Sequence, residues 1–297
     1  MLAPITEIFC DIDDHCKQYF KETKARVLPN PMRQRARKCR LCLSEVITIV
    51  VLFHLSHYRT FKDFYLECVL RDMREYFPNL VSYNRFVELQ KIVIVPLVAY
   101  LISKRGEKTD LYYADSTPLK VCHNRRIWKH QVFKGIATRG KHSMGWFFGF
   151  KLHLSINQKG ELMNFCFTKG NVDDRKVLDV LFKDLTGYGA GDRGYISGVK
   201  ERALAKQGLR FITKTRRNMK PKVLTDFEKY FLSKRGIVET VIEQLKSICQ
   251  IEHTRHRSPM NFISNLLAAL AAYALKPRKP SLKFGFIGAN KPVLMSN

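Results

Sequence analysis

The N-terminal third of the chain carries apolar residues at the spacing of α-helices. This spacing predicts four helices, over residues 5–20, 46–57, 61–76 and 83–101. Ser44, Thr60 and Ser82 stand where side-chain oxygens would cap the first turns of the last three helices. Pro96 falls inside the fourth helix, where its missing N–H predicts a kink or an interruption. This part of the chain is therefore predicted to be all-α.

Beyond Gly106 the apolar residues alternate, which is typical of β-strands. Strands are predicted over 111–115, 146–156 and 162–168, and the turn 157–160 joins the last two as a hairpin. The remaining predicted elements are, in order, a helix (173–185), a glycine-rich segment (187–194), a helix (197–207), a strand (209–213) and two helices (236–251 and 261–275). Three antiparallel strands followed by alternating helices and strands form the element order of an RNase H-like α/β domain.

The balance of charge indicates the class of partner. Fifty-two Lys and Arg against 26 Asp and Glu give a net charge of +26, which concentrates polyanions around the protein. The basic residues are scattered through a globular pattern, which favours nucleic acid over a membrane surface. The longest apolar stretches, 46–55 and 92–102, are shorter than the roughly 18 residues of a membrane span. Eight irregularly spaced cysteines and an acidic start without a secretory signal favour the cytoplasm.

Pattern and charge together predict an α/β protein of three parts. Residues 1–105 are expected to be an all-α DNA-binding region, although helical bundles of any function share its pattern. Residues 106–257 are expected to form the RNase H-like catalytic domain, a mixed sheet flanked by helices. Residues 258–297 are expected to be a C-terminal helix and a basic tail.

Three acids have the placement that metal-dependent phosphodiester chemistry needs. Asp115 ends the first predicted strand, Asp192 lies in the glycine-rich segment, and Glu239 lies one turn into the helix over 236–251. Carboxylates that converge from strand ends and one helix face can hold two divalent cations. Glu243 is an alternative third acid, because it lies on the same helix face as Glu239. Asp173 and Asp174 have the position of a helix cap.

Several basic residues are candidates for contact with DNA, with a solvated surface as the alternative for each; the net charge of +26 favours DNA contact for at least one of the two acid-free runs. The candidates are Arg235 and Lys246 on the face of Glu239, Arg125, Arg126, Lys129 and Lys141 in an acid-free loop that includes Trp128 and Phe133, and Arg216 and Arg217 in a second acid-free run. His153 is expected to be a buried structural histidine. The glycine motifs at 135–142 and 189–194 lack the strands and partner residues of nucleotide sites, so no nucleotide cofactor is expected.

Seven segments resemble bacterial insertion-sequence transposases of the DDE class, most closely the branch called insertion sequence family nine-eighty-two. They are LVSYNRF (80–86), ADSTPLK (114–120), VCHNRR (121–126), MGWFFGFKLH (144–153), GNVDDR (170–175), GDRGY (191–195) and IEHTRHRSP (251–259). The family signature around the third acid is Tyr, Arg, Glu and Lys with two, three and six residues between them. Arg235, Glu239 and Lys246 match this spacing, whereas Leu232 stands at the Tyr position.

The resemblance implies an RNase H-like transposase with Asp115, Asp192 and Glu239 as catalytic acids and as ligands of two Mg²⁺ or Mn²⁺ ions. Such an enzyme binds the terminal inverted repeats of its mobile element, cleaves double-stranded DNA at the element ends and joins these to target DNA. The resemblance also implies at least a homodimer in the bacterial cytoplasm, associated with the nucleoid and not with a membrane. Two alternatives remain, an RNase H-like nuclease or resolvase without joining, and an inactive DNA-binding relic.

Overall fold

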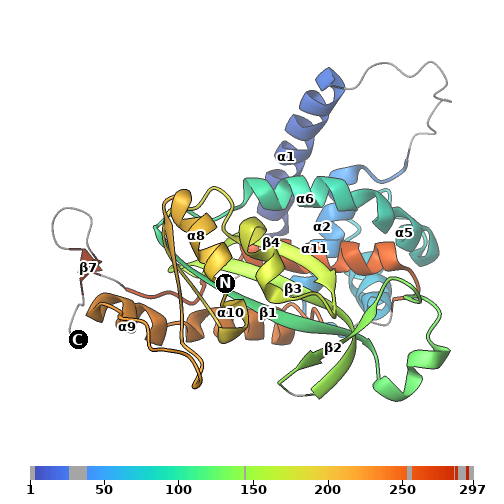
Figure 1. The fold of residues 1–297 in the computed structure, drawn as a ribbon. Coiled ribbons are helices and arrows are strands. Elements are labelled where there is room, and N and C mark those ends of the chain that lie inside the picture. The colour runs from blue at the N-terminus through green and yellow to red at the C-terminus, as the bar shows by residue number, and fades with distance from the viewer. Residues whose placement is uncertain are drawn as a thin grey trace. The chain divides into compact units, whose positions relative to one another are not determined.

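The chain folds into two compact units, one of residues 1–104 with 245–277 and one of residues 105–244 with 278–297. The computed structural model describes residues 4–26, 39–143, 145–252, 256–283, 285–286 and 292–293. The first unit is helical, and the second contains the large β-sheet (Figure 1). Each unit has its own set of buried apolar side chains.

Seven α-helices of the described chain belong mainly to the helical unit. They are α1 (Ile5–Arg26), α2 (Leu43–Leu55), α3 (Phe61–Asp63), α4 (Leu70–Asp72), α5 (Tyr83–Leu89), α6 (Ile94–Ser103) and α11 (Pro259–Ala274), with the π-helix η1 (Phe64–Val69) and the 3₁₀-helix η2 (Gln90–Val93) between them. Helices α2 and α11 pack together and are buried over 46–54 and 266–273. Helices that are apolar all round belong in a core, and these two form the centre of the unit.

Two of the three predicted helix caps are confirmed. The side-chain oxygens of Thr60 and Ser82 each accept a hydrogen bond from the backbone N–H three residues later. The prediction for Ser44 is wrong, because α2 begins at Leu43 and its cap is Cys42, two residues before Ser44. Cys42 and Glu45 form a capping box there, in which each side chain accepts from the backbone N–H of the other.

One helical run in the described part of the chain is longer than the sequence predicted. α5, η2 and α6 follow one another over Tyr83–Ser103, 21 residues with a mean hydropathy of 1.8. Length and composition would let this run cross a membrane, but buried helices of soluble cores pass the same test. Phe86, Val93 and Leu97 are buried within the helical unit, and the predicted interruption is the 3₁₀ turn that ends before Pro96.

The second unit is built on a six-stranded mixed sheet. Its strands are β1 (Leu111–Cys122), β2 (Thr138–His142), β3 (Gly145–Asn157), β4 (Leu162–Lys169), β5 (Gly187–Gly191) and β6 (Leu209–Thr213). The order is β2-β3-β1-β5-β6, and β4 pairs with the part of β3 that β2 leaves open. β1 is antiparallel to β3 and parallel to β5, which is parallel to β6. Antiparallel strands on one side of β1 and parallel strands on the other give the RNase H-like arrangement, so the predicted fold class is confirmed.

Helices cover both faces of this sheet. The helices of this unit are the 3₁₀-helices η3 (Asn124–Lys129), η4 (Asp174–Val177) and η5 (Arg193–Tyr195) and the α-helices α7 (Leu178–Leu181), α8 (Gly198–Lys206), α9 (Asp226–Ser233) and α10 (Gly236–Ser247). On one face Tyr112 and Ala114 of β1 share a buried cluster with α7 and α8. On the other face the ring of Tyr113 packs on Phe231 of α9, with ring centroids 4.6 Å apart. A short sheet of β7 (Gly285–Phe286) and β8 (Pro292–Val293) follows α11 in the chain.

Four element predictions in this unit are wrong. The first strand does not end at Asp115, because β1 continues to pair with β3 as far as Cys122. The basic loop over 125–141 contains η3 and most of β2. The helix predicted over 173–185 is shorter in the structure, where η4 and α7 end at Leu181. Asp184 has a φ of 60°, which is not compatible with a right-handed helix. The helix over 236–251 ends at Ser247, and α9 precedes it without having been predicted.

Candidate active site

The three predicted acids line one pocket of about 660 Å³ in the sheet-containing unit. The pairing of β1 with β5 ends at Tyr113 and Ala190, and Asp115 and Asp192 each lie two residues beyond that pair. Parallel neighbouring strands therefore place these two carboxylates at equivalent positions where the strands part. Glu239 comes from the first turn of α10. One concave surface is thus lined by three acids that are separated by 77 and 47 positions in the sequence.

Asp115 lies deepest among the three acids, with its side chain 20% exposed. Burial raises the pKa of Asp115 to about 6, and the negative charges of Asp192 and Glu239 act in the same direction. The backbone N–H of Ser116 donates to its Oδ1 at 2.8 Å, and Arg235 Nη1 lies 3.7 Å from its Oδ2. Both contacts favour the ionised form and oppose the rise in pKa.

Arg235 joins the acids of the pocket. Its Nη2 donates to Glu239 Oε1 at 2.5 Å while its Nη1 faces Asp115, so the guanidinium lies between the two carboxylates. Arg235 precedes the first residue of α10, and its side chain is 21% exposed against 56% for Glu239. Glu243, the alternative third acid, is not among the residues that line the pocket. Lys246 is not among these lining residues either, and it pairs with Glu252 at 2.8 Å.

Asp174 is a pocket residue that the sequence did not reveal. Its Oδ1 accepts from Lys151 Nζ at 2.7 Å, and its Oδ2 accepts from the Ser116 hydroxyl at 3.3 Å. The neighbouring Asp173 does have the predicted capping role, since its side chain accepts from the backbone N–H of Arg175. A fourth carboxylate therefore reaches the pocket from η4.

His153 is fully buried behind Asp174, with its Nδ1 3.9 Å from Asp174 Oδ1. Its Nε2 is 2.9 Å from the Thr168 hydroxyl, and burial lowers the pKa of the imidazole to about 4. The ring is consequently neutral at physiological pH, which confirms the prediction of a buried histidine.

The pocket has the donors that a hard divalent cation prefers, because Asp115, Asp192 and Glu239 all supply carboxylate oxygens. Burial is the main cause of the raised pKa of Asp115, and repulsion from Asp192 and Glu239 adds to it; a bound cation would relieve that repulsion. In the described residues no three acidic, histidine or cysteine side chains come close enough together to hold a metal. The Arg235 guanidinium supplies the positive charge between Asp115 and Glu239. The residue types therefore fit a metal, provided that Arg235 moves aside.

The family description "Transposase DDE domain" matches residues 105–259, more than half of the chain. The chain belongs to this family. The matched segment includes the whole six-stranded sheet and all three acids of the pocket. Membership makes the protein a transposase of the DDE class, a group of enzymes that cleave and transfer DNA strands. No curated protein matches the chain.

Two solved structures are similar to this DDE transposase at low sequence identity. One is the synaptic complex of the piggyBac transposase with hairpin DNA, at 11% identity, a TM-score of 0.49, and coverage of 90% of this chain and 71% of that chain. The other is the Mos1 strand transfer complex, at 10% identity, a TM-score of 0.24, and coverage of 81% of this chain and 85% of that chain.

The remaining predicted DNA-binding residues of the DDE transposase fall into two exposed groups. Arg125, Arg126 and Lys129 lie on η3, and Lys141 lies on β2 and lines the pocket. Arg216 and Arg217 lie on the segment between β6 and α9, where Arg216 Nη2 donates to the Arg193 carbonyl at 3.4 Å. The structure thus brings Arg235 and Lys141 to the acids and leaves the other candidates on the surface.

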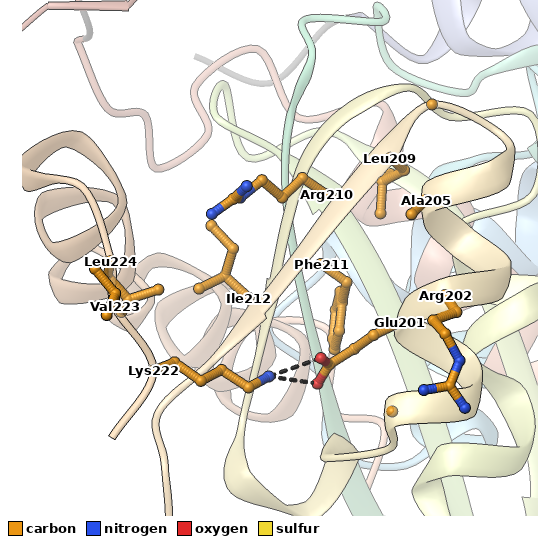
Figure 2. Close-up of a pocket in the computed structure, with 12 residues that line it drawn as sticks. Glu201, Arg202, Ala205, Leu209, Arg210, Phe211, Ile212, Lys222, Val223 and Leu224 are labelled. Carbon is orange, nitrogen blue, oxygen red and sulfur yellow. Dashed lines mark hydrogen bonds and ion pairs between the residues drawn. The ribbon is translucent and has the colours of Figure 1, made fainter. Parts of the chain in front are cut away.

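A second pocket of about 780 Å³ lies between α8, β6 and the segment before α9 (Figure 2). Glu201 is the single acid that lines it, and both its carboxylate oxygens accept from Lys222, at 2.8 and 2.7 Å. Figure 2 shows Lys222 reaching toward this carboxylate from the opposite wall. The larger pocket therefore lacks the group of acids that lines the smaller one.

Proposed function

We propose that this protein is the transposase of a bacterial insertion sequence of the family nine-eighty-two branch. It binds the terminal inverted repeats of its element, cleaves the DNA at the element ends and joins them to target DNA. The observation that carries this proposal is the convergence of Asp115, Asp192 and Glu239 on one pocket within the DDE domain.

In this proposal the three carboxylates hold two Mg²⁺ or Mn²⁺ ions. The ions supply Lewis-acid stabilisation of the attacking and leaving oxygens when bound. Asp115 must be ionised to act as a ligand, and Arg235 assists this by favouring its charged form. When Arg235 turns away from the acids, its guanidinium can donate two hydrogen bonds to a phosphate beside them.

DNA is the substrate that the charge of the protein favours, because +26 concentrates polyanions. Lys141 and Arg235 in the pocket contact the backbone near the scissile phosphate, while Arg125, Arg126, Lys129, Arg216, Arg217 and Lys246 hold more distant phosphates. Joining two element ends requires at least a homodimer on DNA. The irregular, unpaired cysteines suit the reducing bacterial cytoplasm, where the nucleoid is the site of action.

The test is cleavage and strand transfer on a labelled duplex that carries the flanking inverted repeat, with Mg²⁺ present. We expect cleaved and joined products from the native protein and none from Asp192→Asn, which keeps the shape of the side chain but removes its charge. Asp226→Asn is the matched control, because Asp226 is 90% exposed on α9 and pairs only weakly with Lys229 at 3.0 Å.

Three outcomes would change the proposal. Cleavage without joining indicates a nuclease or resolvase. DNA binding without metal-dependent cleavage indicates an inactive relic. Equal loss of activity in Asp192→Asn and Asp226→Asn removes the assignment of the pocket as the active site.

A further inference from the structure

The two tryptophans of the chain are both exposed on the sheet-containing unit. Trp128 on η3 is 84% exposed, and Trp146 at the start of β3 is 62% exposed. Tryptophan is highly buried on average, because its large ring gains the most from leaving water. Two rings left in water on one unit therefore indicate a surface that binds a planar partner.

Each exposed ring has a cation over it. Arg139 Cζ lies 5.9 Å from the ring centroid of Trp128, and Lys141 Nζ lies 5.9 Å from that of Trp146. Arg139 and Lys141 are two residues apart on β2, so their side chains project from the same face of the strand. The four side chains thus form a continuous row, Trp128, Arg139, Lys141 and Trp146, which we call the tryptophan row.

The tryptophan row is attached to the active-site pocket at one end. Lys141 and Trp146 are directly opposite each other in the β2–β3 ladder, and Lys141 also lines the pocket of the three acids. Asn124 Nδ2 donates to the Trp146 carbonyl at 2.8 Å and ties η3, which carries Trp128, to the start of β3. A ligand on the row therefore lies beside the predicted catalytic acids.

The charge around the tryptophan row selects an anionic partner. From residue 116 to residue 160 the chain contains nine Lys and Arg and no Asp or Glu. Protein surfaces that bind single-stranded nucleic acid combine a basic groove with exposed aromatic rings. Lipid surfaces select amphipathic helices, whereas these rings stand on a strand and a 3₁₀ turn.

We propose that the tryptophan row stacks unpaired bases of the DNA substrate beside the active site. The proposal rests on the proposed function for the identity of the substrate, and it adds that the bound DNA is unpaired next to the acids. An interior base of a duplex has both faces covered by its neighbours, so away from a duplex end an exposed indole can stack only on a base that has left the stack. Arg139 and Lys141 then hold the phosphates on either side of that base.

Intrinsic fluorescence tests this directly, because Trp128 and Trp146 are the only fluorescent indoles of the protein. The probe is an oligothymidylate of about 12 nucleotides, compared with a blunt duplex of the same length, without metal so that no cleavage occurs. We expect quenching and tighter binding with the single strand. Trp128→Ala and Trp146→Ala should each weaken single-strand binding by about tenfold and leave duplex binding nearly unchanged.

Val199→Ala is the matched control, because Val199 is 69% exposed on α8 and lies outside the tryptophan row. It should bind the single strand like the native protein. Because these side chains are exposed, the variants should fold, and circular dichroism checks this. Native-like single-strand affinity in both tryptophan variants, or equal quenching by the blunt duplex, overturns the proposal.

A change in fluorescence that follows protein concentration in the absence of DNA, with a matching increase in particle size, would instead make the row a contact between copies of the chain. The fluorescence assay does not depend on catalysis. A protein that binds the single strand through both rings but cuts no DNA therefore supports this inference while contradicting the proposed enzyme function.

Discussion

Asp115 is the residue at which burial and charge compete most directly. Burial and two neighbouring carboxylates raise the pKa of Asp115 to about 6, while Arg235 and the Ser116 N–H oppose this rise. In the proposed function Asp115 is a metal ligand. A metal ligand must be deprotonated to bind, so protons would compete with the cation at this position. The metal affinity of the pocket should therefore depend on pH in the range where Asp115 titrates.

We predict that Mn²⁺ binding weakens as the pH falls through about 6, approaching a tenfold loss of affinity per pH unit below that value. Arg235→Gln removes a charge that favours ionised Asp115, so the pKa of Asp115 rises further and the loss of affinity begins at higher pH. Calorimetric titration with Mn²⁺ at several pH values measures both effects.

Lys234→Gln is the control for this experiment, because it removes the neighbouring cation, whose Nζ lies 4.9 Å from the ring centroid of Tyr230. It should leave the pH dependence unchanged. An affinity that stays constant down to about pH 5 would remove Asp115 from the metal site.

The acids of the pocket differ in how far sequence could predict them. Asp115, Asp192 and Glu239 had a recognisable spacing and a family resemblance, and the structure places them in one pocket. Asp174 lies in the GNVDDR segment of that resemblance, but no role beyond a cap was predicted for it, because an acid after Asp173 at a helix start has a sufficient local explanation. Its contact with Lys151 of β3 depends on the folded sheet, which local sequence does not show.

Strand β5 forms from a segment with weak strand propensity. Glycine weakens strands, yet Gly187–Gly191 is the central parallel strand between β1 and β6. A Cβ on Gly189 would lie 2.8 Å from Phe182 Cε1 and 3.1 Å from Phe211 Cδ2. Packing against these rings therefore requires glycine, and tertiary contacts outweigh the weak strand propensity.

We predict that Gly189→Ala destabilises the protein by about 1–3 kcal/mol, because the added methyl forces buried rings to shift. The melting temperature followed by circular dichroism should fall by several degrees. In Gly198→Ala, the control at the start of α8, the nearest atom to the new Cβ is Arg202 Nη1 at 3.8 Å. This substitution should leave stability unchanged or raise it by up to about 1 kcal/mol. Equal melting temperatures for both variants would contradict the packing argument.

Two other elements were missed for opposite reasons. Strand β2 consists of mostly exposed basic and small residues, so it lacks the apolar alternation that identifies a strand. Helix α9 did carry a signal, because Thr225 and Glu228 form the capping box that the sequence contains at that spacing. Strand β6, with its apolar run over 209–213, was predicted with its observed bounds.

At the scale of the whole molecule, charge predicts the partner but not the surface that meets it. The net charge of +26 follows from composition, whereas the positions of Arg125 and Arg126 on η3 and of Arg216 and Arg217 before α9 depend on the fold. Each phosphate that the protein neutralises releases counterions, so the slope of log K against log salt reports the number of contacts. Salt dependence can therefore distinguish the two groups.

We predict that replacing Arg125 and Arg126 together by Ala reduces the magnitude of this slope by about 2 for duplex DNA, at about 0.9 per lost phosphate contact. The same double change at Arg216 and Arg217 measures the second group. Lys229→Ala removes an exposed cation that pairs with Asp226 at 3.0 Å, and it should lower affinity at low salt only slightly without changing the slope. Fluorescence anisotropy at several salt concentrations gives each slope. If all three variants shift the slope equally per charge removed, DNA binding depends on the net charge of the protein alone, and neither arginine pair is a specific contact surface.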